Sequence, residues 1–315
     1  MRYLLLSMTM LIYASASSQD GKLIEKVRIN ASADSFLRRT NPFYDSLVHI
    51  LDQVEVYRLT YLSDGLKVIA YLDQPKKPGK YPCIIKNHGG NRESGKLQKY
   101  NYMGDMAEMA SWGYCVVGSQ YRGVDGGEGK EDFGGKDLDD VLNIIPLFNE
   151  IGYADTSRIG MYGVSRGGMV TYLALTKTNL IKAAVIVSGV ADFKNAIEAV
   201  DWADTMFYNW LPEYRADKEE WTKKRSVVLF ADKVCKTTPI FIIHGTADDR
   251  VPLPQVLSLA GKFYALKQPF RLALFEGGGH GVAGQFESEV TLETRHFFDD
   301  YLRDKKKWPS LEPHK

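Results

Sequence analysis

Hydrophobic residues recur along the chain with two spacings. Short apolar runs predict strands, and longer segments with apolar residues at every third or fourth position predict helices. From residue 54 to residue 302 the two kinds of segment follow one another in turn. Because alternating strands and helices build a mainly parallel sheet covered on both faces, we expect an α/β fold with a mostly parallel central sheet.

The first two predicted strands differ from the others. Residues 54–62 and 66–72 are separated only by the turn sequence Ser63-Asp64-Gly65. A connection this short joins antiparallel strands, so an antiparallel hairpin is expected to open the sheet. Later strands are predicted at residues 81–86, 114–119, 159–164, 183–188, 239–243 and 271–275. Helices are predicted at residues 97–112, 137–148, 166–176, 256–266 and 290–302.

Residues 190–236 interrupt this alternation and predict a helical insertion. The segment contains the aromatic residues Trp202, Phe207, Tyr208 and Trp210. One interpretation is that these rings only pack the insertion against the rest of the protein. The other is that, placed between late strands, they also form a wall of a substrate pocket.

The two ends of the chain have their own patterns. A basic start, an apolar run at residues 3–13 and small residues after it are typical of a signal peptide, which we assign to residues 1–19. Residues 20–53 are expected to form a helical N-terminal arm, and residues 305–315 a charged tail. The apolar run is too short to span a membrane, so we expect a secreted or periplasmic protein without a stable membrane anchor.

Charge and cysteine content narrow the range of partners. With 40 basic and 39 acidic residues, the formal net charge is +1, which does not favour a nucleic acid or an anionic membrane as partner. A small molecule or peptide of neutral or mixed charge is expected as substrate. The three cysteines lack the spacing of a metal site, and we interpret them as free.

No cofactor or metal is expected. Residues 279–284 fit the pattern GxGxxG of dinucleotide sites, but only one helix follows them, and such a site needs a complete βαβ unit. The glycine-rich residues 123–135 lack the Lys-Ser/Thr pair of a phosphate-binding loop.

The strongest chemical signal is the segment Gly163-Val164-Ser165-Arg166-Gly167-Gly168. It lies where a predicted strand meets a predicted helix, the context in which GxSxG forms the nucleophile elbow of α/β-hydrolases. Glycines on either side of Ser165 permit a sharp turn that exposes the hydroxyl. The same turn leaves the backbone N–H of Arg166 free to bind an oxyanion.

An activated serine needs a base and an acid, which follow it along the chain in that fold. Of the six histidines, His280 follows the late strand at 271–275 within a glycine-rich segment and is the expected base. The acid is expected after the preceding strand, where Asp248 and Asp249 are adjacent. Residue type alone does not separate these two. The acid would fix the tautomer of the histidine and stabilise the imidazolium.

A second oxyanion donor is expected in the loop after residues 81–86, which reads Asn87-His88-Gly89-Gly90-Asn91. Adjacent glycines allow the backbone to approach a substrate carbonyl closely. We therefore predict that Gly89 or Gly90 contributes to the oxyanion hole together with Arg166. His88 is predicted to contact substrate in the pocket.

These motifs resemble the catalytic domain of the prolyl oligopeptidase family over residues 54–302. The resemblance rests on His88-Gly89-Gly90, Tyr121-Arg122-Gly123, residues 134–141, the Ser165 elbow and His244-Gly245-Thr246-Ala247-Asp248-Asp249-Arg250-Val251-Pro252. In the family the acid lies four residues after the histidine that opens the last block, which selects Asp248 over Asp249. The resemblance also implies an α/β-hydrolase domain, here at residues 54–304.

The chain departs from the family in three respects. Only about thirty residues of a mature chain would precede the domain, so the β-propeller of the large peptidases is not expected, and neither is the paired-Glu site that holds a free amino terminus. Where many members have Tyr after the nucleophile, this chain has Arg166, whose side chain is expected to pack against the helix or to meet an acidic group.

The sequence thus predicts a secreted serine hydrolase that works through Ser165, Asp248 and His280 and an acyl-enzyme. A peptidase is favoured by the resemblance. A carboxylesterase acting on acylated carbohydrate or other small esters uses the same triad and is the first alternative. A non-catalytic binding protein with the hydrolase fold is the second.

Overall fold

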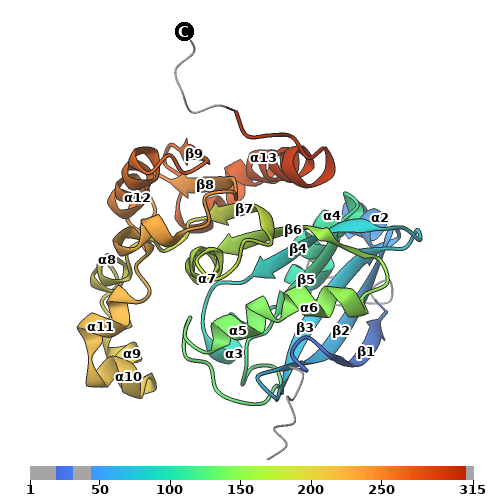
Figure 1. Cartoon of the computed structure of the whole chain (residues 1–315), viewed down its shortest axis with the longest axis horizontal. Helices are drawn as coiled ribbons and strands as arrows, with labels where there is room; N and C mark the ends of the chain where they lie inside the picture. Colours follow the sequence, from blue (N-terminus) through green and yellow to red (C-terminus); the bar gives the residue numbers. More distant parts are fainter. Residues whose placement is uncertain (1–18, 31–43, 310–315) are drawn as a thin grey trace, which may run out of the picture.

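A nine-stranded sheet organises the described part of the chain, residues 19–30 and 44–309 of a computed structural model (Figure 1). The strand order is β1-β2-β3-β5-β4-β6-β7-β8-β9. The first three strands and β5 are joined by antiparallel pairing, and from β5 to β9 all pairing is parallel. The strands are β1 (Leu23–Ile29), β2 (Val54–Ser63), β3 (Leu66–Pro75), β4 (Tyr81–Asn87), β5 (Cys115–Ser119), β6 (Ala154–Val164), β7 (Ile181–Val187), β8 (Ile240–Gly245) and β9 (Phe270–Phe275).

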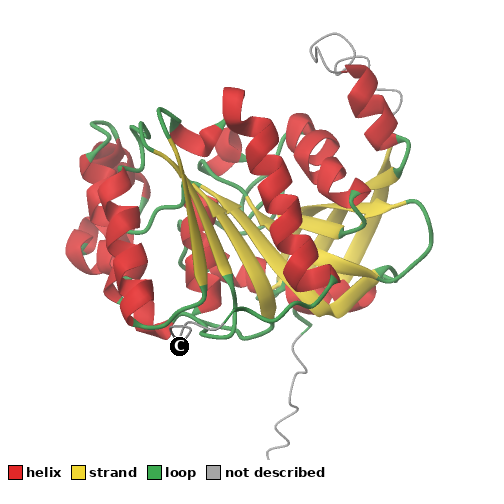
Figure 2. Cartoon of the chain, turned by 90° about the horizontal axis from the view of Figure 1, so that it is seen from above, coloured by secondary structure: helices red, strands yellow, loops and turns green. Residues whose placement is uncertain are grey.

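Helices cover both faces of the sheet, as the view from above shows (Figure 2). One face packs against α5 (Asp137–Leu142), α6 (Ile144–Leu147), α7 (Arg166–Leu175) and α12 (Leu253–Ala265). The other packs against α2 (Tyr44–Leu51), α4 (Met106–Ser111) and α13 (Glu287–Phe298). The insertion forms α8 (Phe193–Glu198), α9 (Ala203–Trp210), α10 (Pro212–Ala216) and α11 (Lys218–Lys223). This architecture is the predicted α/β-hydrolase fold.

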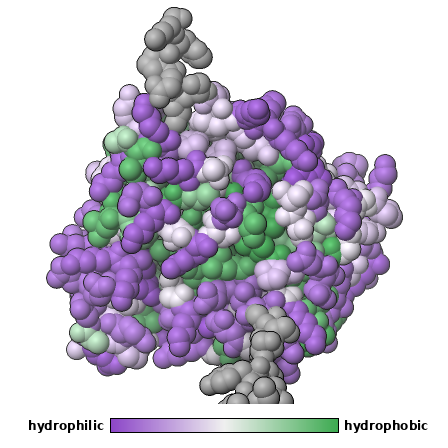
Figure 3. All heavy atoms as spheres, viewed as in Figure 1, coloured by the Kyte–Doolittle hydropathy of each residue, from purple (hydrophilic) through white to green (hydrophobic). Residues whose placement is uncertain are grey.

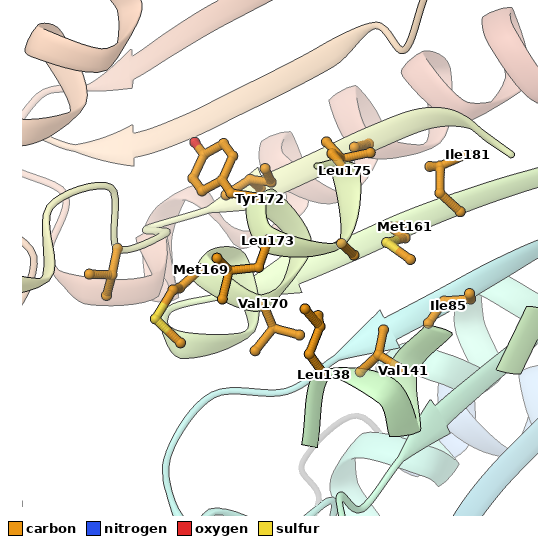
Figure 4. Close-up of a cluster of buried hydrophobic side chains, with 14 of the residues drawn as sticks. Ile85, Leu138, Val141, Met161, Met169, Val170, Tyr172, Leu173, Leu175 and Ile181 are labelled. Atoms are coloured by element: carbon orange, nitrogen blue, oxygen red, sulfur yellow. The ribbon is translucent and has the colours of Figure 1, made fainter. Parts of the chain in front are cut away.

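The central strands are apolar because both of their faces are covered. Every residue of β8 is buried, as is nearly every residue of β4 and β7. On one face, Val170 of α7 lies next to Leu138 of α5, in the same buried cluster as Leu173 of α7 and Met161 of β6 (Figure 4). Burial of this helix between the sheet and α5 sets the position of its N-terminal end.

The predicted N-terminal hairpin is confirmed. β2 and β3 pair in antiparallel register from Val54 opposite Pro75 to Ser63 opposite Leu66. Asp64 and Gly65 join them with φ values of 51° and 77°. Two residues of positive φ give the tight turn whose twist matches that of the two strands.

The predicted helical arm at residues 20–53 is wrong in its first part. Leu23–Ile29 is a strand, β1, which pairs with β2 at the edge of the sheet, and among the described residues of this range the helix is Tyr44–Leu51. Most side chains of β1 are exposed, so the strand lacks the alternation of apolar and polar residues that identifies a half-buried strand. Backbone pairing holds it in place, assisted by an ion pair between Arg28 and Glu55.

Two predicted helices are interrupted. Residues 137–148 form α5 and α6, with Asn143 between them and a 3₁₀ turn at the end. Pro146 lacks the N–H that would bond to the Leu142 carbonyl, so a regular helix cannot continue through this point. The helix predicted at 97–112 is a π-helical segment, Asn101–Asp105, followed by α4.

The surface seen in Figure 3 carries hydrophobic residues toward its centre, with hydrophilic residues around them. Among the residues that the structure describes, no helix has both the length and the apolar character needed to cross a bilayer. The predicted signal peptide lies outside the described residues except for residue 19.

The functional residues predicted from the sequence follow four parallel strands. The glycine loop follows β4, Ser165 follows β6, Asp248 follows β8 and His280 follows β9. Parallel strands end at the same edge of a sheet, and ligands of open α/β sheets bind at that edge. The order of the strands therefore brings residues from distant parts of the chain to one site.

Candidate active site

Ser165 lies in a strained turn between β6 and α7. Its φ of 57° and ψ of −122° are rare for a residue with a side chain. Glycines make the turn possible, because an added Cβ at Gly167 would collide with the Asn87 carbonyl, and one at Gly163 with Gly167 and Thr171. The turn places the hydroxyl above the N-terminus of α7.

Three predicted side chains come together at this turn. The Ser165 Oγ lies 2.8 Å from Nε2 of His280, and Nδ1 of His280 lies 3.0 Å from each carboxylate oxygen of Asp248. In this arrangement the hydroxyl donates to Nε2 and the Nδ1–H donates to Asp248. His280 is therefore held in the tautomer that accepts a proton from Ser165.

The Asp248 carboxylate is buried and strongly hydrogen-bonded. Burial alone would raise the pKa of Asp248, but hydrogen bonds from His280 and from the Val251 N–H outweigh it and lower the pKa to about 2. The N–H groups of Arg250 and Val251 donate to Oδ1 at 3.0 and 2.8 Å. The group is thus anionic at any pH at which the protein would work.

The structure distinguishes Asp248 from its neighbour. Asp249 is exposed, whereas Asp248 points inward to His280. His244, at the end of β8, is fully buried and its Nε2 lies 2.8 Å from the Val251 carbonyl. It therefore supports the loop that carries Asp248.

The glycine loop after β4 lies directly against Ser165. A Cβ built on Gly89 would come within 3.1 Å of the Ser165 Cβ, and Gly90 borders the same cavity as Ser165. Within the described part of the chain, the N–H groups of Gly90 and Arg166 have no acceptor. Both predicted sources of oxyanion donors therefore lie next to Ser165 and have unpaired N–H groups.

His88 is buried beneath this loop. Its Nδ1 lies 2.9 Å from the Gly89 carbonyl, and its ring stacks on Tyr121 with centroids 4.3 Å apart. Burial lowers the pKa of His88 to about 4; the hydrogen bond to the Gly89 carbonyl raises it, and the nearby Arg166 charge, a smaller effect, lowers it. His88 is therefore neutral near pH 7 and donates through Nδ1 to the loop.

The Arg166 side chain turns away from solvent into a group of acidic residues. It forms ion pairs of 2.8 Å with Glu131 and 2.6 Å with Asp137, and its guanidinium stacks 4.0 Å from the centroid of the Phe133 ring. Glu131 and Phe133 belong to the connection between β5 and α5, and Asp137 is the first residue of α5. Of the two expectations for this side chain, the acidic contact is the one observed.

An apolar cavity of about 140 Å³ opens beside Ser165. The insertion supplies most of its wall, and Phe133 and Arg166 also line it. The residues that line it include Val190, Phe193, Ala196, Ile197, Val200, Trp202, Ala203, Met206, Phe207, Val251 and His280. Hydrophobic burial of one substrate side chain is the interaction that this lining favours.

The five predicted pocket residues divide between the cavity and other places. Trp202 and Phe207 line the cavity. Tyr208 is 53% exposed on the outer face of α9, and the Trp210 ring stacks on the guanidinium of Arg92, while His88 supports the glycine loop from below. Helical periodicity explains the division within α9, because Phe207 and Tyr208 necessarily face different directions.

Sequence reasoning missed several residues that hold the site. Ser188 follows β7, is fully buried, and accepts a hydrogen bond of 2.9 Å from the Gly281 N–H while lowering the pKa of Asp248. Its position after a central strand was the only available signal. No sequence signal identified Glu131 and Asp137 as site residues, because nothing in the sequence pairs them with Arg166.

The described residues contain no group of three His, Cys, Asp or Glu side chains arranged to hold a metal ion. Cys83, Cys115 and Cys235 are all free, as predicted.

Two protein-family models match the chain. The model of the prolyl oligopeptidase family matches residues 100–305. The model described as acetyl xylan esterase matches residues 41–145. The two matches overlap only between residues 100 and 145, so they rest largely on different parts of the chain.

Individual relatives are similar over most of this chain. The uncharacterized peptidase YtmA of Bacillus subtilis is 30% identical over 222 residues, which are 69% of this chain and 82% of that protein. The uncharacterized peptidase YuxL of the same organism is 31% identical over 70% of this chain but only 34% of its own length. A solved structure of the acylaminoacyl peptidase of Pyrococcus horikoshii has a TM-score of 0.68 and 27% identity over 86% of this chain and 45% of its own.

The buried His88 predicts a pH dependence of stability. Its pKa in the folded protein, about 4, lies below its ordinary value of 6.5. The stabilisation from neutral His88 is therefore complete above about pH 6.5 and is lost as the pH falls toward 4, by up to roughly 3 kcal/mol. His88→Asn keeps a donor for Gly89 but does not titrate, so its free energy of unfolding should fall less over this window. Urea unfolding at several pH values measures this, and equal slopes for the two proteins would contradict it.

Proposed function

The chain belongs to the prolyl oligopeptidase family and is a serine hydrolase; on that premise we propose that it is a serine peptidase whose catalytic residues are Ser165, Asp248 and His280. The observation that carries the proposal is the continuous relay from the Ser165 hydroxyl through His280 to a buried carboxylate. This relay borders a cavity that has room for a substrate side chain.

In the first step the Ser165 Oγ attacks the carbonyl carbon of the scissile bond while His280 Nε2 takes the hydroxyl proton. A tetrahedral intermediate forms, and its oxyanion lies where the N–H groups of Arg166 and Gly90 or Gly89 can bind it. Asp248 stabilises the imidazolium through the Nδ1–H hydrogen bond. The imidazolium then gives its proton to the leaving amine, the C–N bond breaks, and an acyl-enzyme remains.

In the second step a water molecule attacks the acyl-enzyme. His280 takes a proton from this water and later returns it to the Ser165 oxygen, so that the acid is released and the enzyme is regenerated. No group other than the triad, the backbone N–H donors and water takes part in these steps.

An ester substrate is the second candidate, because the match to the acetyl xylan esterase model covers the glycine loop and the segment that holds Arg166. The same relay would cleave an ester with an alcohol as leaving group. We favour a peptide substrate because the prolyl oligopeptidase match covers the greater length, including Ser165, Asp248 and His280.

We also propose that the protein is exported, because residues 1–19 have the charge and apolar pattern of a signal peptide. Expressed with this N-terminus in a Gram-negative bacterium, the protein should appear in the periplasm or the medium. N-terminal sequencing should place the cleavage near residue 19. An intact N-terminus on protein retained in the cytoplasm would contradict export.

Replacing the nucleophile tests the proposed reaction. Ser165→Ala should lower kcat/KM by roughly 10⁴- to 10⁶-fold, because triad-dependent rate is lost. Turnover is measured on matched panels of peptides and of acyl esters with the same side chains. Loss of peptide cleavage in the variant supports the peptidase, loss of ester cleavage alone supports the esterase, and full activity of Ser165→Ala on both would refute the assignment.

The cavity lining predicts substrate preference. Met206 is half-buried in the cavity wall, so Met206→Ala enlarges the space beside Ser165. The ratio of kcat/KM for bulky over small apolar side chains should rise by roughly tenfold. Tyr208→Ala, on the same helix but exposed, is the control and should leave this ratio unchanged. An equal effect of both substitutions would show that the cavity does not receive the side chain.

A further inference from the structure

Three successive carbonyls of the glycine loop are each held by a side chain. The His88 carbonyl accepts from the Tyr121 hydroxyl at 3.0 Å, the Gly89 carbonyl from His88 Nδ1 at 2.9 Å, and the Gly90 carbonyl from Arg166 Nη1 at 3.1 Å. A peptide N–H points opposite to the carbonyl of the same peptide plane. The orientation of the N–H groups in this loop is therefore determined by these three donors.

Gly90 lies between two of the held peptides. His88 donates to the Gly89 carbonyl and so holds the peptide plane before Gly90. Arg166 donates to the Gly90 carbonyl and so holds the peptide plane after it. Gly90 has a φ of 71° and is exposed, so its own backbone restrains it little. The two side-chain contacts supply the restraint that the residue lacks.

Arg166 itself is fixed by a buried network. Its side chain is only 3% exposed and pairs with Glu131 and Asp137. Glu131 also accepts from the Arg92 N–H at 3.2 Å, just beyond the glycine loop, and Asp137 accepts from the N–H groups of Phe133 and Gly134. The guanidinium thus joins the residue after the nucleophile to both sides of the loop.

The geometry points to Arg166 as a positioning residue: we propose that its guanidinium holds the Gly90 carbonyl, and with it the peptide plane after Gly90, so that the flexible Gly90 keeps its own N–H facing the oxyanion formed at Ser165. This inference rests on the proposed function, because it gives Arg166 a part in the same reaction. The planar fork of arginine suits this part, since it reaches Glu131, Asp137 and the Gly90 carbonyl together. A single ammonium group would have to choose among these acceptors.

The chain offers a matched control in Arg225. It is also buried, donates to the carbonyls of Phe133 and Asp132, and stacks on Trp221. It makes no contact with the glycine loop among the described residues. Arg225→Met therefore removes a buried cation from the same acidic region while leaving the Gly90 carbonyl bonded.

The experiment measures kcat, KM and the affinities of two inhibitors for Arg166→Met and Arg225→Met. A boronic acid forms a tetrahedral adduct with Ser165 and uses the oxyanion donors, and the carboxamide with the same side chain fills only the cavity. In Arg166→Met, kcat and boronate affinity should each fall by roughly 100-fold, the effect of losing one oxyanion donor. KM and carboxamide affinity should change by less than about threefold, as expected when only the transition state is affected.

The remaining variants separate positioning from folding. Arg166→Lys keeps the charge but not the fork, so it should recover thermal stability more than kcat. Glu131→Gln weakens the ion pair that fixes the Arg166 side chain, so it should lower kcat while KM stays unchanged. This variant tests the positioning role of Arg166 if Arg166→Met does not fold. The proposal is overturned if Arg166→Met lowers kcat no more than Arg225→Met does, or if boronate and carboxamide affinities fall equally.

If the proposed peptidase function itself is wrong, the same experiments give a different result. In that case the wild-type protein itself would show no turnover that Ser165→Ala abolishes, and both proposals would fall. Normal wild-type turnover with an unchanged kcat in Arg166→Met would overturn only the role of Arg166.

Discussion

The close approach of α7 to the end of β4 is the constraint on which the site depends. No side chain fits at Gly167, because a Cβ there would occupy the position of the Asn87 carbonyl. With the helix this near, the chain can leave β6 only through a sharp turn, and Ser165 adopts its positive φ there. The same approach brings the glycine loop against Ser165. The positions of Ser165 and of the candidate oxyanion donors are therefore set by one backbone contact.

Two buried groups of charges near Ser165 stabilise this arrangement. On one side Asp248 is held by two backbone N–H groups and His280; on the other Arg166 is held by Glu131 and Asp137. A buried charge is costly unless it is paired and hydrogen-bonded. Each of these groups has several partners, so the polar side chains around Ser165 have little freedom. Arg166 and His280 also line the apolar cavity, together with residues of the insertion.

Much of the fold could be predicted because it depends on the burial of apolar side chains. The central strands and α7 show this burial directly in their sequence, and the turn at Asp64 and Gly65 has its own residue signature. β1 could not be found in this way, since backbone pairing at the sheet edge leaves its side chains exposed. Pro146 signals the interruption of the helix after Leu142, but the apolar periodicity of residues 137–148 favoured one continuous helix.

The candidate site could be predicted where its residues follow one another in a fixed order. Ser165, Asp248 and His280 follow β6, β8 and β9 in that order, and the structure brings them within hydrogen-bond distance. Contacts between residues with no such order could not be foreseen. The pairing of Arg166 with Glu131 depends on how a long connection folds back on the loop, and the direction of Tyr208 depends on how α9 is rotated against the sheet. Both features depend on tertiary packing and leave no pattern in the local sequence.

The central claim is that the relay of Asp248 and His280 makes Ser165 a nucleophile. The most direct measurement is the reaction of the wild-type protein with a fluorophosphonate, followed by digestion and mass spectrometry of the modified peptide. The account predicts a single covalent phosphonyl group on Ser165, formed faster than on any other serine of the protein. Absence of modification, or modification distributed over other residues with Ser165 intact, would contradict it.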